Sequence, residues 1–162
     1  DLKYGWRSGL WTPQRVMKST GSELGISLKK DVVWRNLRRF GLSFAQQLEL
    51  CVGDEGIPSE CEKLLREKKR VLFYVVTELY VPNLPAVALI GLTPSKKTPL
   101  ACAVEHRHRI KTDFVEYFLR ELLILHPEQH IAVLLKHKSD YRTDRLRQLK
   151  YQYRRLHLFE PD

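Results

Sequence analysis

The stretch IAVLLKHKSDYRT, residues 131–143, gives the clearest indication of the fold. Its first five residues are all apolar, which is typical of a strand buried on both faces. The run then changes abruptly to Lys136, His137 and Lys138. Ligands and catalytic groups of α/β domains gather at the carboxyl ends of strands. The positive charge at this strand end is therefore a candidate functional feature.

The composition indicates a packed globular chain. Of the 162 residues, 43% are hydrophobic, and no apolar run approaches the roughly 18 residues that a membrane span needs. Three cysteines, Cys51, Cys61 and Cys102, are widely spaced and odd in number. They suit a reducing compartment and indicate neither a disulfide framework nor a thiolate metal site.

The basic charge is concentrated at the amino-terminal end. The chain carries 28 Lys and Arg against 19 Asp and Glu, a net charge of +9. Residues 1–45 hold nine basic and three acidic residues, a surplus of six, which leaves a surplus of three for the rest. Such a cationic segment is expected of a module that meets phosphates. A basic surface that only keeps the protein soluble is the alternative.

Two helices are predicted in this basic segment. The first, over residues 9–25, has Thr12 as N-cap, Pro13 in the first turn and Gly25 at its exit. The second, over residues 27–41, is expected to be capped by Ser27 and ended by Gly41.

The second helix is predicted to be amphipathic. We expect its core-facing stripe to be Val32, Val33, Leu37 and Phe40. Trp34 is also expected in the core. The opposite face carries Lys29, Lys30, Arg35, Arg38 and Arg39. Two short helices with a cationic second helix indicate a helix-turn-helix, in which the second helix enters the major groove of DNA. An ordinary helical hairpin with a solvated charged face is the alternative.

Residues 45–58 are expected to form a linker, because Gly53, Gly56 and Pro58 break regular structure. A helix then begins with Ser59 and Glu62 at capping-box spacing. The remaining pattern predicts three strands, a helix capped by Thr112, the strand at 131–135, and a last helix over 143–156. The predicted fold class is α+β: a helix-turn-helix module over 1–44, the linker over 45–58, and a mixed sheet flanked by helices over 59–162. An RNase H-like sheet is one such arrangement.

Several motifs, in one order, resemble the transposases of mariner-type bacterial insertion sequences. They are SGLWTPQRV, VVWRNLRRFGLS, RVLFYV, TDFVEYFLRELL and HIAVLLKHKSDYRT. The first two motifs together are similar to the second helix-turn-helix of that family, and the later ones are similar to its RNase H-like catalytic domain. The resemblance covers nearly the whole chain.

The resemblance implies that the catalytic residues of the family have been lost. The family holds two metal ions with three carboxylates, because hard cations need oxygen ligands. Its first aspartate falls at Val75 and its second at Lys136, and Tyr141 stands where a histidine or asparagine is usual. Valine offers no oxygen and an ammonium repels a divalent ion. We therefore expect no catalytic residues, no metal and no cofactor.

Other acids and histidines leave alternatives open. Asp140 and Glu78, with Glu160 or Asp162, could rebuild an active Mg²⁺-dependent nuclease or transposase site. A His106 and His108 pair could bind a metal on one strand face, although a basic strand end is the alternative interpretation. The last helix offers either a second nucleic-acid surface or a solvated outer face, through Arg145, Arg147, Lys150, Arg154 and Arg155.

These observations predict a transposase-derived, catalytically inactive protein that binds double-stranded DNA, with no membrane partner. Lys29, Lys30, Arg35, Arg38 and Arg39 are assigned to the duplex. Lys136 and Lys138 are candidate phosphate contacts. A homodimer or a larger assembly is a further expected form, and a protein-interaction subunit that ignores DNA is the competing prediction. The expected location is cytoplasmic and nucleoid-associated.

Overall fold

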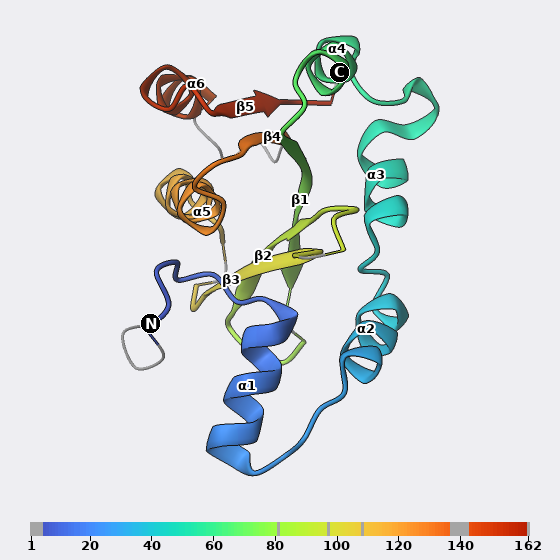
Figure 1. The fold of residues 1–162 in the computed structure, drawn as a ribbon, viewed down its shortest axis with the longest axis vertical. Coiled ribbons are helices and arrows are strands. Elements are labelled where there is room, and N and C mark those ends of the chain that lie inside the picture. Colours follow the sequence, from blue (N-terminus) through green and yellow to red (C-terminus); the bar gives the residue numbers. More distant parts are fainter. Residues whose placement is uncertain (1–4, 81, 97, 108, 137–142, 162) are drawn as a thin grey trace.

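The computed structural model describes residues 5–80, 82–96, 98–107, 109–136 and 143–161 and has an α+β fold (Figure 1). The helices are α1 Pro13–Leu24, α2 Lys30–Arg39, α3 Phe44–Val52, α4 Ser59–Glu67, α5 Thr112–Leu125 and α6 Thr143–Gln152, with a short 3-10 turn at Gly53–Glu55. The strands are β1 Val71–Tyr80, β2 Val87–Leu92, β3 Leu100–Glu105, β4 His130–Leu135 and β5 Leu156–Phe159.

The strands form one mixed sheet in the order β3-β2-β1-β4-β5. β2 runs antiparallel to both β1 and β3, whereas β4 lies parallel to β1 and β5 lies parallel to β4. Both parallel pairs need a crossover, and α5 and α6 supply them. The predicted α+β class and mixed sheet are confirmed.

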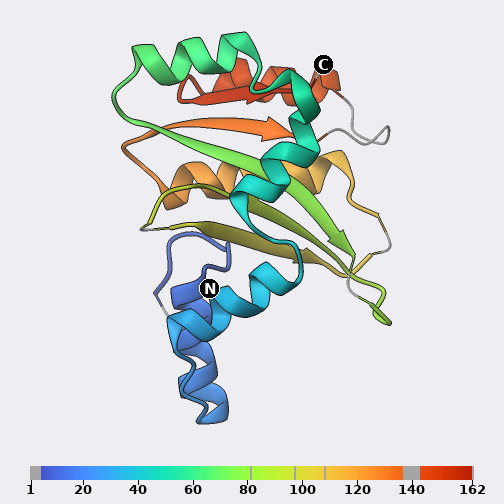
Figure 2. The same ribbon diagram turned by 90° about the vertical axis from the view of Figure 1, so that its right-hand side faces the viewer.

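Helices cover both faces of the sheet, so the central strands are buried on each side. α5 and α6 lie on one face, and α2, α3 and α4 lie on the other (Figures 1 and 2). Alternation along β1 divides its side chains between these layers: Tyr74 and Val76 join the core beneath α5 and α6, while Phe73 and Val75 pack toward α3 and α4. This explains why the strand at 131–135 is continuously apolar.

The first predicted helix is confirmed in detail. Thr12 is the N-cap of α1, and its side chain accepts a hydrogen bond from the Arg15 amide. Pro13 follows in the first turn, and Gly25 closes the helix with a left-handed φ of 64°. A β-carbon is disfavoured in that conformation, which is why glycine suits the position.

The second helix differs from its prediction in its first residues and in the stripe that it buries, whereas Gly41 follows its end as expected, with a left-handed φ of 72°. The predicted cap Ser27 is wrong, because α2 begins after Lys29, which provides no side-chain cap. Two members of the predicted core stripe are also wrong: Val32 is 38% exposed and Phe40 is 72% exposed. The contact with the sheet is instead made by Trp34 and Leu37, which pack on β2 side chains. A helix that rests on a sheet through one edge buries a narrower stripe than a core helix does.

The predicted linker is largely helical. α3 occupies Phe44–Val52 and is capped by Ser43, whose side chain accepts from the Gln46 amide. Phe44, Leu48 and Cys51 pack against the sheet core. Gly53 and Gly56, with positive φ, do end regular structure before α4, as glycines at such positions should.

Three further boundaries differ from their predictions. Ser59 and Glu62 form no capping box, because the N-cap of α4 is Pro58 without a side-chain bond. Thr112 lies inside α5, whose N-cap is Lys111. The last helix ends at Gln152, and Leu156 belongs to β5 instead, where it is buried as an edge-strand residue.

The amino-terminal segment is attached to the β3 edge of the sheet. Trp11 and Cys102 exchange two backbone hydrogen bonds, of 2.7 and 2.8 Å, which adds an isolated bridge to β3. The Gly9 amide donates to Glu121 of α5. α1 therefore starts from a fixed point on the sheet, and the α1–α2 pair is held at both ends.

Candidate nucleic-acid interface

The five predicted DNA contacts lie on an exposed surface of α2 and its amino-terminal end. We name this surface the basic face; it consists of Lys29, Lys30, Arg35, Arg38 and Arg39, all of them exposed. Trp34 and Leu37 fix the rotation of the helix by packing against a buried cluster that contains Leu42 and residues of β2 and β3. The structure thus places all five cations on one short element, where each of them is exposed.

An open groove of about 590 Å³ runs beside the arginines. It is lined by Asp31, Trp34, Arg35, Arg38 and Arg39. Trp34 is half-buried: it packs against a buried cluster on one side and lines this groove on the other, so it lies at the margin of the core rather than inside it.

The basic face is electrostatically unpaired in the part of the chain that the structure describes, where no ion pair joins its cations to an acid. Asp31 is one turn from Arg35, yet no ion pair within 4 Å links them. Arg38 and Arg39 lie in the last turn, where cations stabilise the helix dipole, and Asp31 lies in the first turn. Part of this charge pattern therefore serves the helix itself, which makes Arg35, in mid-helix, the most informative residue for a test of binding.

Val75, the position that the resemblance aligns with a catalytic aspartate, is closed to solvent. Val75 is fully buried, opposite Leu134 in the β1–β4 register and opposite Leu92 in the β1–β2 register. It belongs to an apolar cluster with Cys51 of α3 and Cys61 of α4. A valine is well suited to that environment because it packs on a pleated, fully covered surface.

Lys136 directly follows β4, and its amide donates to the Val76 carbonyl at 3.2 Å. Its side chain is exposed. Burial raises the pKa of the Cys51 thiol, and the positive charge of Lys136 acts in the opposite direction. Lys136 therefore lies on the α3 side of the sheet, the same face as Val75. The other two predicted positions at this strand end, Lys138 and Tyr141, lie outside the described residues.

The acids proposed for a relocated metal site are not brought together where the structure describes them. Glu78 accepts a hydrogen bond from the Tyr80 hydroxyl at 3.1 Å and lies on the opposite face of β1 from Val75. Glu160 directly follows β5, the edge strand on the opposite side of the sheet from β3. Asp140 and Asp162 are outside the described residues. Among those residues, no group of three His, Cys, Asp or Glu side chains could hold a metal ion.

His106, one member of the predicted histidine pair, is not on a strand. β3 ends at Glu105, so His106 lies in the bend that follows it, exposed beside Arg107. His108 lies outside the described residues. The expectation of two ligands on one strand face is therefore wrong for His106.

The basic residues predicted on the last helix have separate surroundings. Arg145 forms an ion pair with Glu116 of α5 at 2.6 Å. Arg155 lies beyond the helix and donates to the carbonyls of His126 and Gln129, both at 2.8 Å. These two arginines hold α5, α6 and β4 together. Arg147 and Lys150 remain on the exposed side of α6.

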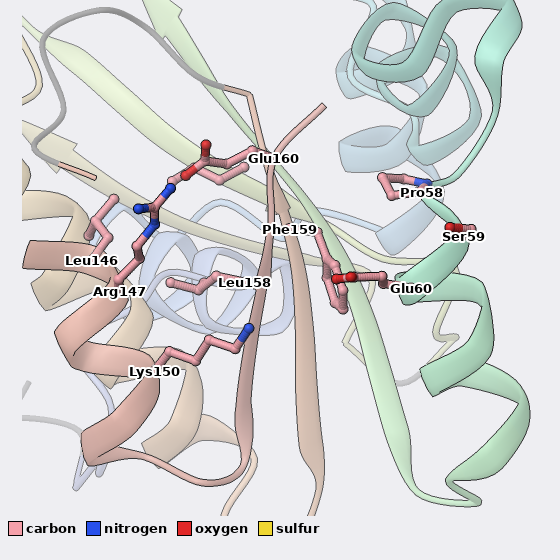
Figure 3. Close-up of a pocket in the computed structure, with 10 residues that line it drawn as sticks. Pro58, Ser59, Glu60, Leu146, Arg147, Lys150, Leu158, Phe159 and Glu160 are labelled. Atoms are coloured by element: carbon pink, nitrogen blue, oxygen red, sulfur yellow. The ribbon is translucent and has the colours of Figure 1, made fainter. Parts of the chain in front are cut away.

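Sequence reasoning missed a cleft at the outer edge of the sheet (Figure 3). The cleft has a volume of about 410 Å³ and lies between α4 and α6 along β5. It was missed because the helical pattern of the last segment extends to Leu156, which conceals the strand. The alternation of LHLF was the available signal.

A pair of histidines was also missed. His130 Nδ1 and His157 Nε2 are 3.0 Å apart on neighbouring strands, with stacked rings. Burial, together with the charge of Lys68, lowers the pKa of His157 to about 4. The pair is therefore neutral at physiological pH, with one ring donating to the other.

Comparisons with known proteins leave the family of this chain open. No family model matches it, and no curated protein matches it. Among solved structures it is similar to a chain of the "CryoEM structure of simian T-cell lymphotropic virus intasome in complex with PP2A regulatory subunit B56 gamma", with a TM-score of 0.42 and 9% identity. The match covers 72% of this chain and 46% of that chain, so this chain spans less than half of the length of its neighbour. None of the described helices is long and apolar enough to cross a bilayer.

Proposed function

We propose that this protein binds double-stranded DNA through the basic face of α2 and that its sheet domain is a scaffold derived from a transposase catalytic domain. The observation that carries the proposal is the basic face itself: five exposed cations on one helix that is fixed to the sheet by Trp34 and Leu37. A helix of this length spans roughly 15 Å, which suits entry into one major groove.

Most contacts of the basic face would go to phosphates. Lys29 and Lys30 stand at the start of α2 and would act as point charges near the DNA backbone. An arginine in mid-helix can instead present its planar fork to the O6 and N7 atoms of guanine. Arg35 has the position for that role, while Arg38 and Arg39 would contact phosphates of the adjacent DNA strand.

The sheet supports a derivation from the RNase H-like fold. Its order β3-β2-β1-β4-β5, with β2 antiparallel to both neighbours, is a mixed sheet flanked by helices, which is the general architecture that the resemblance implies. The positions of two metal-binding carboxylates are a buried valine, Val75, and a cationic strand end, Lys136. Neither residue can bind a metal ion, which supports a scaffold that performs no strand transfer. Lys136, at the end of β4, could instead contact a phosphate.

The proposal is tested by fluorescence anisotropy of a labelled duplex across a salt series. If all five cations contact phosphates, the logarithm of affinity should fall with the logarithm of salt with a slope of about −4.5. Arg35→Glu/Arg38→Glu should reduce the magnitude of that slope by about 2 and weaken binding at low salt by at least about tenfold.

The matched control is Lys63→Glu/Arg66→Glu on α4. It makes the same change of net charge on exposed residues that pair only with acids of their own helix. Equal losses in both variants would mean that DNA responds to net charge rather than to α2. No binding at low salt would reject the proposal and favour a protein-interaction subunit. Lys136→Ala tests the strand end separately, since an unchanged affinity and slope would remove Lys136 from the interface.

A further inference from the structure

The outer edge of β5 is an unpaired sheet edge. β5 is the last strand in the sheet order and pairs with β4 alone among the described strands. The Ile131 amide donates to the Arg155 carbonyl, so the parallel register turns residues 155, 157 and 159 toward β4. The backbone N–H and C=O of Leu158 therefore face outward. Such an edge is a ready template for another extended chain.

The cleft runs along this edge. Its lining comes from α4, from β4 and β5, and from α6: Pro58, Ser59, Glu60, Leu135, Leu146, Arg147, Lys150, Leu158, Phe159 and Glu160. Figure 3 shows Arg147 and Lys150 extending from α6 toward β5, with Glu60 on the opposite side. The two helices form walls and the strand edge forms the floor.

The two walls differ in chemistry, and this difference defines the occupant. On the α6 side, Arg147 and Lys150 are exposed around the apolar side chains of Leu146 and Leu158. Arg147 has only a distant partner on its own helix, Asp144 at 3.9 Å, with both side chains mostly exposed. Lys150 has no ion pair within the described residues. On the α4 side, Ser59 and Glu60 stand near the helix start. An added strand sends alternate side chains to opposite walls.

We propose that the β5 edge binds an extended segment of a partner protein that carries acidic side chains at alternate positions. The acidic side chains would meet Arg147 and Lys150, while uncharged side chains would face Ser59 and Glu60. Backbone hydrogen bonds to Leu158 would provide affinity, and the cationic wall would provide selectivity.

A second copy of this chain fits the edge less well. Figure 1 shows α6 and α4 beside β5 on opposite faces of the sheet. Antiparallel pairing of two β5 strands would place the two α6 helices on the same face of the joined sheet. It would bring Arg147 and Lys150 of one copy toward the same cations of the other, and like charges repel. A bare extended segment with acidic side chains avoids this conflict.

The experiment uses anisotropy with a labelled peptide of alternating glutamate and valine. One comparison peptide has the same composition in paired order, Glu-Glu-Val-Val, and another has lysine in place of glutamate. The alternating acidic peptide should bind at least about tenfold more tightly than either comparison peptide. Arg147→Glu/Lys150→Glu, which changes only exposed side chains, should abolish that preference. Leu158→Pro removes the outward amide and should weaken binding by about tenfold, with its melting curve recorded as a check on folding.

Other outcomes would overturn the proposal. Equal binding of the three peptides, or no binding, would show that the edge does not select acidic strands. A concentration-dependent dimer in sedimentation that is lost in Leu158→Pro would assign the edge to self-association. If duplex DNA displaces the peptide, and still does so in Arg35→Glu/Arg38→Glu, the α6 cations bind nucleic acid and the proposal fails. If the double variant abolishes the displacement, DNA acts through the basic face and the proposal stands. This double variant should otherwise bind peptide normally, which separates the two proposals.

Discussion

The buried histidine His126 should make the stability of this protein depend on pH in a defined window. His126 is 7% exposed, and its Nε2 atom lies 2.7 Å from the Tyr74 hydroxyl. Burial lowers its pKa from 6.5 to about 4. Above pH 6.5 the ring is neutral in both the folded and the unfolded chain, so its contribution to stability is complete there. As the pH falls from 6.5 toward 4, the unfolded chain takes up a proton that the folded chain refuses, and stability is lost.

The size of this loss follows from the same values. The interval from 6.5 to about 4 spans about 2.5 pH units, which at about 1.4 kcal/mol per unit gives about 3 kcal/mol as the order of magnitude. The assay is urea denaturation of the wild type and of His126→Gln at several pH values. The difference between the two free energies of unfolding should shrink by about 3 kcal/mol between pH 7 and pH 4. Carboxylates and His157 titrate in both proteins, so they cancel in this difference.

Tyr74→Phe serves as the control for the hydrogen bond. It should lower the free energy of unfolding at neutral pH by about 1–2 kcal/mol, because the ring nitrogen of His126 loses a partner. The pH dependence should persist in this variant, since the histidine remains buried. A difference between wild type and His126→Gln that stays constant from pH 7 to pH 4 would refute the reasoning.

Four other substitutions test the packing around glycines, the cap of α2 and the buried position of Val75. In urea denaturation, Gly91→Ala should lower the free energy of unfolding by about 1–3 kcal/mol, because a β-carbon there would lie 3.1 Å from the Tyr74 ring. Gly21→Ala, in open space on α1, should raise the free energy of unfolding by about 0.5–1 kcal/mol. Lys29→Ser should add the missing cap of α2 and raise the melting temperature, with a gain of about 1 kcal/mol, while anisotropy shows weaker DNA binding. Val75→Asp should lower the free energy of unfolding by about 3 kcal/mol or more in urea denaturation, and recovery of that loss on adding Mg²⁺ would contradict the reasoning.

Much of the secondary structure could be predicted because its signals are local. The Thr12 cap and the exit at Gly25 define α1 through the conformations that those two residue types favour. The continuous apolar run of β4 indicated burial on both faces, and the helices on each side of the sheet confirm it. Signals of this kind need no knowledge of the rest of the chain.

The errors arose where tertiary packing overrides local pattern. The stretch that became α3 contains breakers at its end, and its helix depends on packing of Phe44 and Cys51 against the sheet. β5 is only four residues long and follows a helical pattern without a glycine or proline between them, so only pairing with β4 identifies it. The cleft depends on this strand and therefore could not be predicted either.

The candidate sites differ in the same way. The basic face could be predicted because helical periodicity alone gathers its cations on one element. The rotation of α2 about its own axis could not be predicted, because Val32 and Phe40 are exposed although they are as apolar as the residues that contact the sheet. The sheet decides between them through Trp34 and Leu37.

The apolar packing around Val75 and the attachment of the helices to the sheet are physically connected. A two-metal site needs carboxylates that face an open, hydrated cleft. In this chain Val75 instead packs with Cys51 of α3, and α3 follows α2 after a short turn through Leu42, which is itself buried against the sheet. An oxygen ligand at position 75 would weaken the packing that holds α3, and with it the support of α2. Under the proposed function, this apolar face, which lies where the resemblance implies a metal site, is therefore what keeps the basic face rigid. A carboxylate placed at position 75 is expected to weaken DNA binding through this loss of packing.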